Sequence, residues 1–465
     1  MKLNVITLLV ALPLAACSLT PELAKPASPI ATQFPLQMPV DNQPTAAGED
    51  WQHIFPDPRL QMLLVTALSN NRDLRLAALN VQAVQIQYDI QRATQLPALE
   101  GTAGTTRQRV TTEGASPSIN SQKSLGIGIS AFELDLFGRA ASLSDAAFAR
   151  YLASEQGQKA VQISLLASVA DAYYGELLAE EQLQLAQQTW EDWQHSLELV
   201  RVLHSANQSS GLDLAQAEGQ VASAEADLHA RKRGLELARN ALQLLVGTAI
   251  PKNLPSAPRL AELPRLTLSA GLPSDLLIRR PDILQAEHNL QAANADIGAA
   301  RAAFFPRLSL TATLGYASPE LHDLFSGSRR VWSFAPQLNV PLFNAGRLRS
   351  ELRLAEIRKS TAVAEYERAI QSAFREVADC LAGRETFGRQ IAAQEHAVAS
   401  ASRRLELSTL RYRAGVDGRL ELLDAQRQLY TAQQTLLDLR KSELSNTVAF
   451  YKAIGGNFAS RKNQD

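Results

Sequence analysis

The fold is decided by residues 183–200, which read LQLAQQTWEDWQHSLELV. Two apolar series step by seven through this stretch: one is Leu183, Trp190 and Leu197, and the other is Ala186, Trp193 and Val200. An apolar residue at every seventh position is typical of helices that pack side by side as a coiled coil. Residues 138–247 contain no proline. We therefore predict an unbroken helix over about 140–204, roughly 100 Å long, and a second long helix after it.

This helical stretch occurs twice. Gly138-Arg139 reappears as Gly346-Arg347, and 347 − 139 = 208. The same offset carries Gly247 onto Gly455. Before the first hairpin the offset is one residue larger, at 209. One register over most of the chain indicates two copies of one structural unit.

Each copy is expected to hold a short helix, a β-hairpin and a long helix pair. The predicted boundaries are repeat 1 at 58–262, with its hairpin at about 98–136 and its helix pair at about 138–248, and repeat 2 at 263–456, with its hairpin at about 307–342 and its helix pair at about 346–455. Each pair turns at a Gly-bearing tip, at 209–211 and 415–418. The polar segment 457–465 is expected to be disordered.

The hairpins are predicted from a change of spacing. In the first, Leu125, Ile127 and Ile129 alternate with Gly126 and Gly128, and simple alternation puts Phe132 on the side of the glycines. Polar loops are expected over 111–123 and 317–330.

The N-terminus has the form of a secretory signal. Lys2 precedes an apolar run at 5–14 that is too short to span a bilayer, and Leu14-Ala15-Ala16-Cys17 follows. This LAAC string resembles the bacterial lipobox, so we expect a signal peptide at 1–16 and a covalent lipid on Cys17. Ser18 after the cysteine favours the outer membrane. Residues 17–57 are predicted to be a lipid-anchored extended segment.

Composition excludes several classes of function. The net charge of −1 gives no reason to expect nucleic-acid binding. Cys380 is the only cysteine besides Cys17, so no internal disulfide is expected, and Cys380 reads as a small buried residue. No run of 18 apolar residues follows the signal, and the seven histidines show no metal-binding spacing. We predict no enzyme, no metal and no cofactor other than the lipid.

Four strands pose a problem of closure. A sheet in a bilayer must close without a free edge, and about eight strands is the smallest membrane barrel. Two chains would give 2 × 4 = 8 strands, which fill their own interior, and three would give 3 × 4 = 12. We therefore predict a mixed α/β membrane channel with a lumen. Together with the family resemblance described next, this predicts a homotrimer of mostly helical chains that share a 12-stranded transmembrane β-barrel.

Several strings give the chain a strong resemblance to the TolC-like outer membrane efflux protein family, in particular to its lipoprotein branch serving RND-type pumps. These strings are residues 132–138 (FELDLFG), 276–283 (LLIRRPDI), 341–346 (PLFNAG), 422–427 (LLDAQR) and 451–456 (YKAIGG). The resemblance implies a passive trimeric conduit in the outer membrane with a large periplasmic helical tunnel. It also implies two partners, a periplasmic membrane-fusion adaptor and an inner-membrane RND-type transporter.

The same resemblance implies a gate at the periplasmic tip. The matching positions are Tyr412, Leu420, Glu421 and Asp424, and Asp213 corresponds to Glu421 in the first copy. Arg411, Arg413 and Arg419 are near enough in sequence to bridge the acids. The string Arg279-Arg280-Pro281-Asp282 lies just before a helix and is interpreted as a structural junction between the copies.

Two alternatives remain open at this stage. The chain could serve a protein-secretion system, or it could be a structural lipoprotein with coiled-coil arms and no pore. The sequence names neither the exported substrate nor the particular adaptor and transporter.

Overall fold

A computed structural model describes residues 18–27, 29–31, 51–111, 117–251, 253–264 and 279–456. The expected signal peptide, Cys17 and the segment 457–465 lie outside these residues. The described elements are α2 (Trp51–Ile54), α3 (Pro58–Asn70), α4 (Arg72–Ala93), β1 (Leu99–Val110), β2 (Ser118–Leu134), α5 (Arg139–Ser205), α6 (Gly211–Val246), α7 (Pro281–Ala302), β3 (Arg307–Ser318), η3 (Gly327–Arg329), β4 (Arg330–Asn339), α8 (Arg347–Arg413) and α9 (Arg419–Ala453).

The element boundaries follow the sequence offsets closely. The 67-residue helices α5 and α8 have corresponding first residues, since 139 + 208 = 347, and corresponding last residues, since 205 + 208 = 413. Helices α4 and α7 keep the larger offset, since 72 + 209 = 281 and 93 + 209 = 302. From α4 and α7 onward, the two halves therefore share the order of one helix, two strands and two long helices, with η3 added between the strands of the second half.

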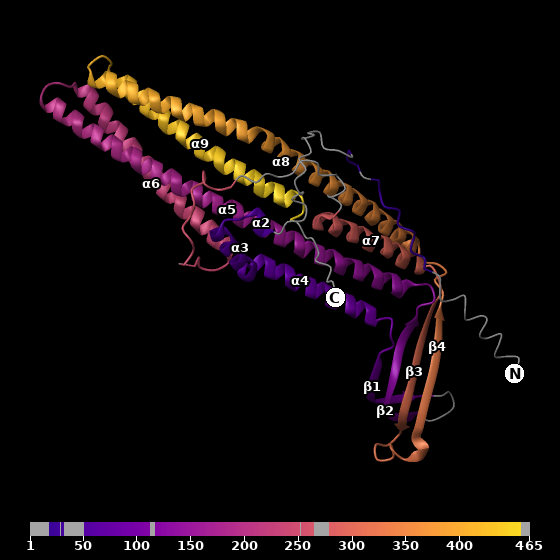
Figure 1. Cartoon of the computed structure of the whole chain (residues 1–465). Coiled ribbons are helices and arrows are strands. Elements are labelled where there is room, and N and C mark those ends of the chain that lie inside the picture. Colours follow the sequence, from indigo (N-terminus) through magenta and orange to yellow (C-terminus); the bar gives the residue numbers. More distant parts are fainter. Residues whose placement is uncertain are drawn as a thin grey trace. The chain divides into compact units, whose positions relative to one another are not determined.

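The four strands form one antiparallel sheet in the order β1-β2-β3-β4 (Figure 1). Strand β2 begins at Ser118, although polar composition predicted a loop as far as Lys123. The prediction was wrong because residues 118–123 pair with β1 along its whole loop-side half. Within this chain β1 and β4 are the edge strands of the sheet.

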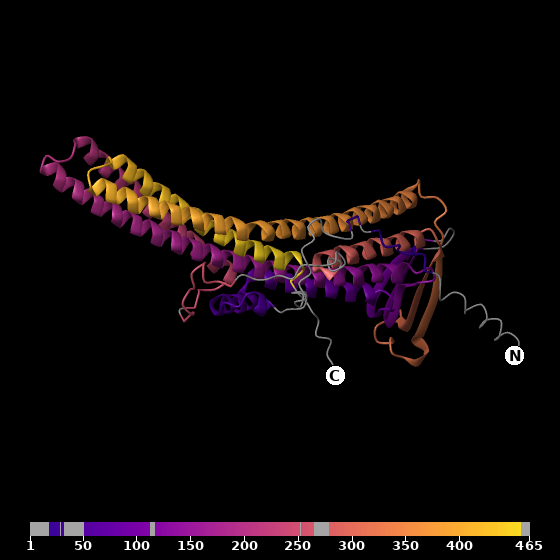
Figure 2. The ribbon, with the colours of Figure 1, turned by 45° about the horizontal axis from the view of Figure 1, so that its top comes forward.

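The chain divides into two compact units, each of which draws on both repeats. The described residues of the strand unit fall within 18–27, 79–156 and 284–368, and those of the helix-tip unit fall within 29–78, 157–283 and 369–456. The strand unit therefore contains the whole sheet. The helix-tip unit contains both Gly-bearing turns, which Figures 1 and 2 show at the same end of the paired helices.

The main core of the helix-tip unit gathers around α3 and the middle of α5. Leu60, Leu63 and Leu64 of α3 are fully buried, and Tyr173 of α5 is 0% exposed. The Tyr173 hydroxyl donates a 2.5 Å hydrogen bond to Asp57, which also caps the N-terminus of α3. This polar pair fixes α3 on α5, because a buried hydroxyl without a partner would be costly.

Asn71 separates α3 from α4, although the sequence predicted a single short helix before the first hairpin. Its backbone is extended, and its side-chain amide donates a 2.8 Å hydrogen bond to the Leu245 carbonyl. Its side-chain oxygen accepts the Leu74 amide hydrogen at 3.0 Å, which caps the start of α4. A contact 174 residues away in sequence therefore sets this break.

Residues 18–27 are packed within the strand unit along α7. Asn294 donates a 2.8 Å hydrogen bond to the Pro21 carbonyl, and Lys25 forms an ion pair with Glu287. Thr20 lies over Gly298, where an added Cβ would stand 2.1 Å from the Thr20 hydroxyl oxygen. Glycine at 298 is therefore required for the N-terminal segment to approach this helix.

Two further sequence expectations concern burial and hydropathy. Cys380 of α8 is buried, and burial raises the pKa of its thiol to about 11, so the thiol stays protonated and unreactive.

Among the described helices, none combines the length and the hydropathy that a membrane crossing requires.

Candidate functional site: the two-faced sheet and the helix tip

The register of the sheet separates its side chains onto two faces. Paired residues of antiparallel strands share a face, and residues two apart along a strand share it too. Ile127 pairs with Leu314, which pairs with Trp332. We call this side the apolar face. Its apolar residues are Leu99, Gly101 and Ala103 of β1, Ile119, Leu125, Ile127, Ile129, Phe132 and Leu134 of β2, Leu308, Leu310, Ala312, Leu314 and Tyr316 of β3, and Trp332, Phe334, Pro336 and Leu338 of β4.

The opposite side, called the polar face, carries small and hydrophilic residues. Ser333, Gln337, Ser309, Thr311, Thr313, Thr102, Thr106 and Gln108 lie on it. Glu100 and Glu133, the only acids of the described strands, lie there as well. The apolar face is uncovered within the chain: Trp332 is 77% exposed and Phe334 is 59% exposed. So large an exposed apolar surface indicates contact with lipid or with another chain.

A β-bulge keeps the apolar face continuous along β2. The register shifts between Ile129 and Phe132, and Ala131 has a left-handed backbone with φ of 50°. The extra residue brings Phe132 opposite Leu310 on the apolar face. Simple alternation, which assigned Phe132 to the side of the glycines, was therefore wrong beyond the bulge.

Strands β2 and β3 approach each other closely on the polar face. Gly126 pairs with Gly315, and an added Cβ at Gly315 would stand 2.3 Å from the Leu125 carbonyl oxygen. Only glycine fits this approach. A polar face opposite an exposed apolar face is the pattern of a membrane-barrel wall.

At the helix tip, one arginine holds both predicted gate acids. Arg404 of α8 donates 2.7 Å hydrogen bonds to Glu421 and to Asp424 of α9. These three side chains are exposed or nearly so. The two carboxylates hold the pKa of the Arg404 guanidinium above its usual value through hydrogen bonds, that of Glu421 first. Arg404 was missed by sequence reasoning because it lies 17 residues before Glu421, across the turn.

The arginines that sequence proximity favoured have other partners. Arg411 binds Asp417 in the turn through hydrogen bonds of 2.6 and 2.7 Å. Arg419 is 6% exposed and lies near Ser196 of α5. Desolvation by burial lowers the pKa of the Arg419 guanidinium. The expectation that these residues bridge Glu421 and Asp424 was therefore wrong for Arg411 and Arg419.

The remaining predicted gate residues also lie at this end. Asp213 forms a capping box with Ser210 at the start of α6, and the Ser210 hydrogen bonds lower the pKa of its carboxyl. Tyr412 is half-buried on the last turn of α8, and Leu420 is 71% exposed on the first turn of α9. The structure brings Glu421 and Asp424 together on Arg404, while Asp213 serves the other helix pair.

In the string Arg279-Arg280-Pro281-Asp282, the buried and hydrogen-bonded residue is Arg280. The Arg280 guanidinium is 5% exposed, and it donates to Asp282, to Glu376 of α8 at 2.9 Å and to the Ala453 carbonyl at 2.7 Å. Pro281 is the first residue of α7, where the missing N–H costs nothing. Arg279 is exposed. Arg280 thus ties the start of α7 to the long helices.

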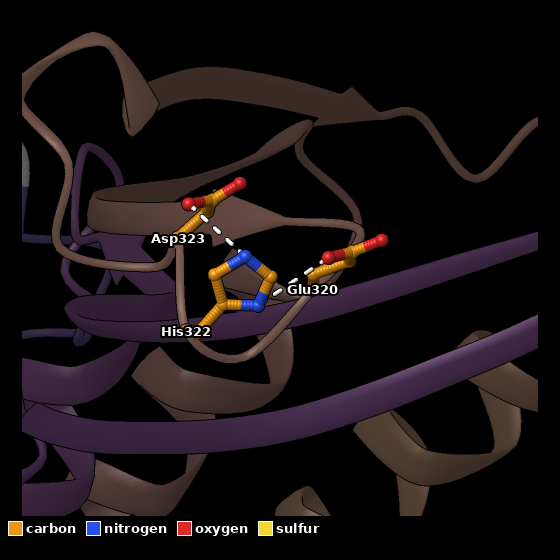
Figure 3. Close-up of side chains that lie close together, drawn as sticks. All are labelled: Glu320, His322 and Asp323. Carbon is orange, nitrogen blue, oxygen red and sulfur yellow. Dashed lines mark ion pairs between the residues drawn. The ribbon is translucent and has the colours of Figure 1, made fainter.

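Sequence analysis did not single out one further cluster, which is shown in Figure 3. His322 lies in the β3–β4 loop with its Nδ1 3.3 Å from Glu320 and its Nε2 3.4 Å from Asp323. All three ligand-type atoms lie within 4.8 Å of one another. Each ring nitrogen faces a different carboxylate on an exposed loop, which is the geometry of a surface ion pair. Its sequence signal is the short string E-x-H-D.

Strands with one apolar face, joined to long paired helices, define the class of this protein as a membrane channel subunit. The profile of the outer membrane efflux protein family matches residues 63–248 and 272–456. The toluene efflux pump outer membrane protein TtgC of Pseudomonas putida is 44% identical over 97% of this chain and 95% of its own. Outer membrane protein OprJ of Pseudomonas aeruginosa is 41% identical over 98% of this chain and 96% of its own.

A solved structure shares the same architecture. The open state of the Neisseria gonorrhoeae MtrE outer membrane channel is similar with a TM-score of 0.86 and 39% identity, over 95% of this chain and 98% of that one. The chain belongs to the outer membrane efflux protein family, and it is an outer membrane channel component of an efflux pump. This is a family of transport proteins and not of enzymes.

Proposed function

We propose that three copies of this chain assemble into a passive export conduit. The observation that carries this proposal is the open, two-faced sheet, whose edge strands β1 and β4 have no partner within the chain's own sheet. Three sheets edge to edge supply 3 × 4 = 12 strands, which is enough to leave an aqueous lumen behind an apolar outer face.

The energy for export comes from a separate transporter. The chain carries no nucleotide-binding motif, and its relative TtgC is named as part of a toluene efflux pump. A periplasmic adaptor and an inner-membrane RND-type transporter are the partners of this conduit. Small organic compounds are the proposed cargo.

The conduit closes at the helix tip. Arg404 binds α9 to α8 through Glu421 and Asp424, and three such acid pairs in a trimer give a ring of six carboxylates. Such a ring attracts cations, and each arginine neutralises part of it. Tyr412 and Leu420 supply the apolar part of the closure, with Asp213 beside them on the first helix pair.

Cys17 carries the covalent lipid after removal of residues 1–16. The LAAC string supports this assignment. The packing of residues 18–27 along α7 supports it too, because this packed segment begins one residue after Cys17. Mass spectrometry of the mature N-terminus tests this part. A diacylated or triacylated Cys17 is expected, and an unmodified Cys17 would contradict it while leaving the conduit untouched.

Deletion of the gene, with complementation by the wild-type chain, tests the function as a whole. We expect the deletion strain to become sensitive to toluene, dyes, detergents and hydrophobic antibiotics, and complementation to restore resistance. Unchanged sensitivity to all of these compounds in a strain without a second such channel would refute the assignment to small-molecule export.

A further inference from the structure

The charges of the four strands are distributed unevenly between the two faces. Four of the five basic residues lie on the apolar face, all at its loop-side end: Arg107, Arg109, Lys123 and Arg330. We call these four the basic collar. The fifth, Arg307, lies on the polar face at the opposite end of the sheet. Both strand acids are on the polar face, so no strand carboxylate of the described sheet shares a face with the collar.

The collar directly follows the apolar part of the same face. On β3 the apolar side chains run from Leu308 to Tyr316, which is about 26 Å along the strand at ~3.3 Å per residue. Tyr316 pairs with Arg330, and Trp332 is the next residue of β4 on that face. Aromatic residues therefore mark the boundary between the apolar side chains and the collar, as at a membrane–water interface.

A groove crosses this boundary. It is an open groove of about 530 Å³, lined mainly by apolar residues and glycines of the four strands and by Phe325 of the loop, with Arg330 as the charged residue of its lining. Gly101 leaves room in it, since an added Cβ there would meet no atom within 4 Å. Phe325 packs edge-on against Tyr316, with ring centroids 5.8 Å apart. The groove is thus mainly apolar and includes one cation.

In the β3–β4 loop, Glu320 and Asp323 lie against His322, and Asp323 also lies 3.9 Å from Arg329. Lys123 donates to the Pro319 carbonyl in a 3.4 Å contact. Among the residues that the structure describes, no carboxylate is ion-paired with the collar, which therefore places positive charge above an apolar surface.

We propose that the basic collar and this groove bind a phosphate-bearing anionic lipid of the leaflet that surrounds the loop side of the sheet. The acyl chain lies in the groove along Gly101 and Ile127, and the phosphate lies against Arg330 and Lys123. The proposal rests on the proposed function in one respect, namely that the apolar face is turned to lipid. Charge complementarity selects the headgroup, since a zwitterionic lipid presents no net charge to four cations.

Native mass spectrometry of the full-length detergent-purified assembly tests this site. The probes are phosphatidic acid and phosphatidylcholine with identical acyl chains. The wild-type assembly is expected to retain phosphatidic acid preferentially. Lys123→Gln with Arg330→Gln is expected to reduce that retention by about fivefold for each charge removed, with phosphatidylcholine unaffected. The matched control is Arg307→Gln, which removes one charge from the other face and the other end.

Two further experiments distinguish the contribution of the acyl chain from that of the phosphate. Gly101→Leu fills the groove and is expected to lower retention of both lipids. An excess of inorganic phosphate is expected to leave phosphatidic acid bound, because the acyl chain contributes to binding.

Equal retention of the two lipids by the wild type, an equal effect of Arg307→Gln, or displacement by inorganic phosphate would each overturn the lipid site. The same preparations are assayed for conductance in planar bilayers. If they conduct without lipid preference, the lipid site fails alone. If they neither assemble nor conduct, the proposed function fails, and the lipid site fails with it.

Discussion

Arg404 of α8 donates a 2.7 Å hydrogen bond to Glu421 of α9, and the same nitrogen donates to Asp424 at the same distance. The short turn at 414–418 connects the two helices, and this contact, together with a further hydrogen bond from Arg404 to Gln428 of α9, holds the start of α9 on its neighbour. Loss of either side of the contact is expected to loosen the tip. The two sides differ in the charge that remains, and this difference makes the gate testable.

Removing the acids is expected to open the tip. Glu421→Ala with Asp424→Ala breaks the link to Arg404 and removes the carboxylate ring. Planar-bilayer conductance is expected to rise, with a fall in cation selectivity. Arg404→Ala breaks the same link but leaves the acids, so conductance is expected to rise with increased cation selectivity.

The control for the tip is Arg403→Ala. Arg403 binds Glu406 three residues further along the same helix, and within the described residues it forms no hydrogen bond or ion pair with α9. The conductance and the ion selectivity of the Arg403→Ala channel are expected to match those of the wild type. Unchanged conductance in both tip variants would show that this contact does not gate the channel.

Replacing Arg280 with leucine is expected to destabilise the helix-tip unit. The change leaves the buried Ala453 carbonyl and the partly exposed Glu376 carboxylate without their donor, at a cost of about 1–3 kcal/mol. The melting temperature of the purified protein measures it. Arg279→Ala, at the exposed neighbouring residue, is expected to change the melting temperature little. Equal effects of the two variants would contradict a junction built on Arg280.

Replacing Gly298 with alanine is expected to release residues 18–27 from α7. The new Cβ would overlap the Thr20 hydroxyl, so the segment must move away. Limited proteolysis measures the release as faster cleavage within residues 18–27. Gly175→Ala is the matched control, because a Cβ there meets nothing within 4 Å. Cleavage at the wild-type rate in Gly298→Ala would refute the packing described for this segment.

The assignment of the faces is tested by a neighbouring pair of arginine substitutions. Leu314→Arg places a charge in the apolar face and is expected to cost about 2–4 kcal/mol of stability in a bilayer. Thr313→Arg places the same charge on the polar face one residue earlier and is expected to be tolerated. Reversible unfolding from lipid vesicles measures both. Equal costs would mean that the two faces are not distinguished by lipid.

The sequence predicted the helices well because their information is local and repeated. Seven-residue spacing and the 208-residue offset located α5 and α8 to within a residue or two. The features that local patterns missed depend on distant contacts. Asn71 divides α3 from α4 through Leu245, and pairing with β1 extends β2 back to Ser118.

The tip residues show the same limit more sharply. The resemblance located Glu421 and Asp424, but their partner had to be read from coordinates, because a turn brings Arg404 to them from the preceding helix. Nearness in sequence favoured Arg411, whose side chain instead holds the turn at Asp417. Which arginine pairs with a given carboxylate is therefore decided by the positions of both residues on the helices and not by their distance in sequence.

The central claim is that one chain supplies too few strands to close a wall, so that several copies surround one pore. The most direct measurement is the mass of the purified assembly by native mass spectrometry, combined with its conductance in a planar bilayer. The account predicts three chains per particle and a conducting pore. A particle of one chain, or a three-chain particle that does not conduct even after the tip acids are removed, would contradict it.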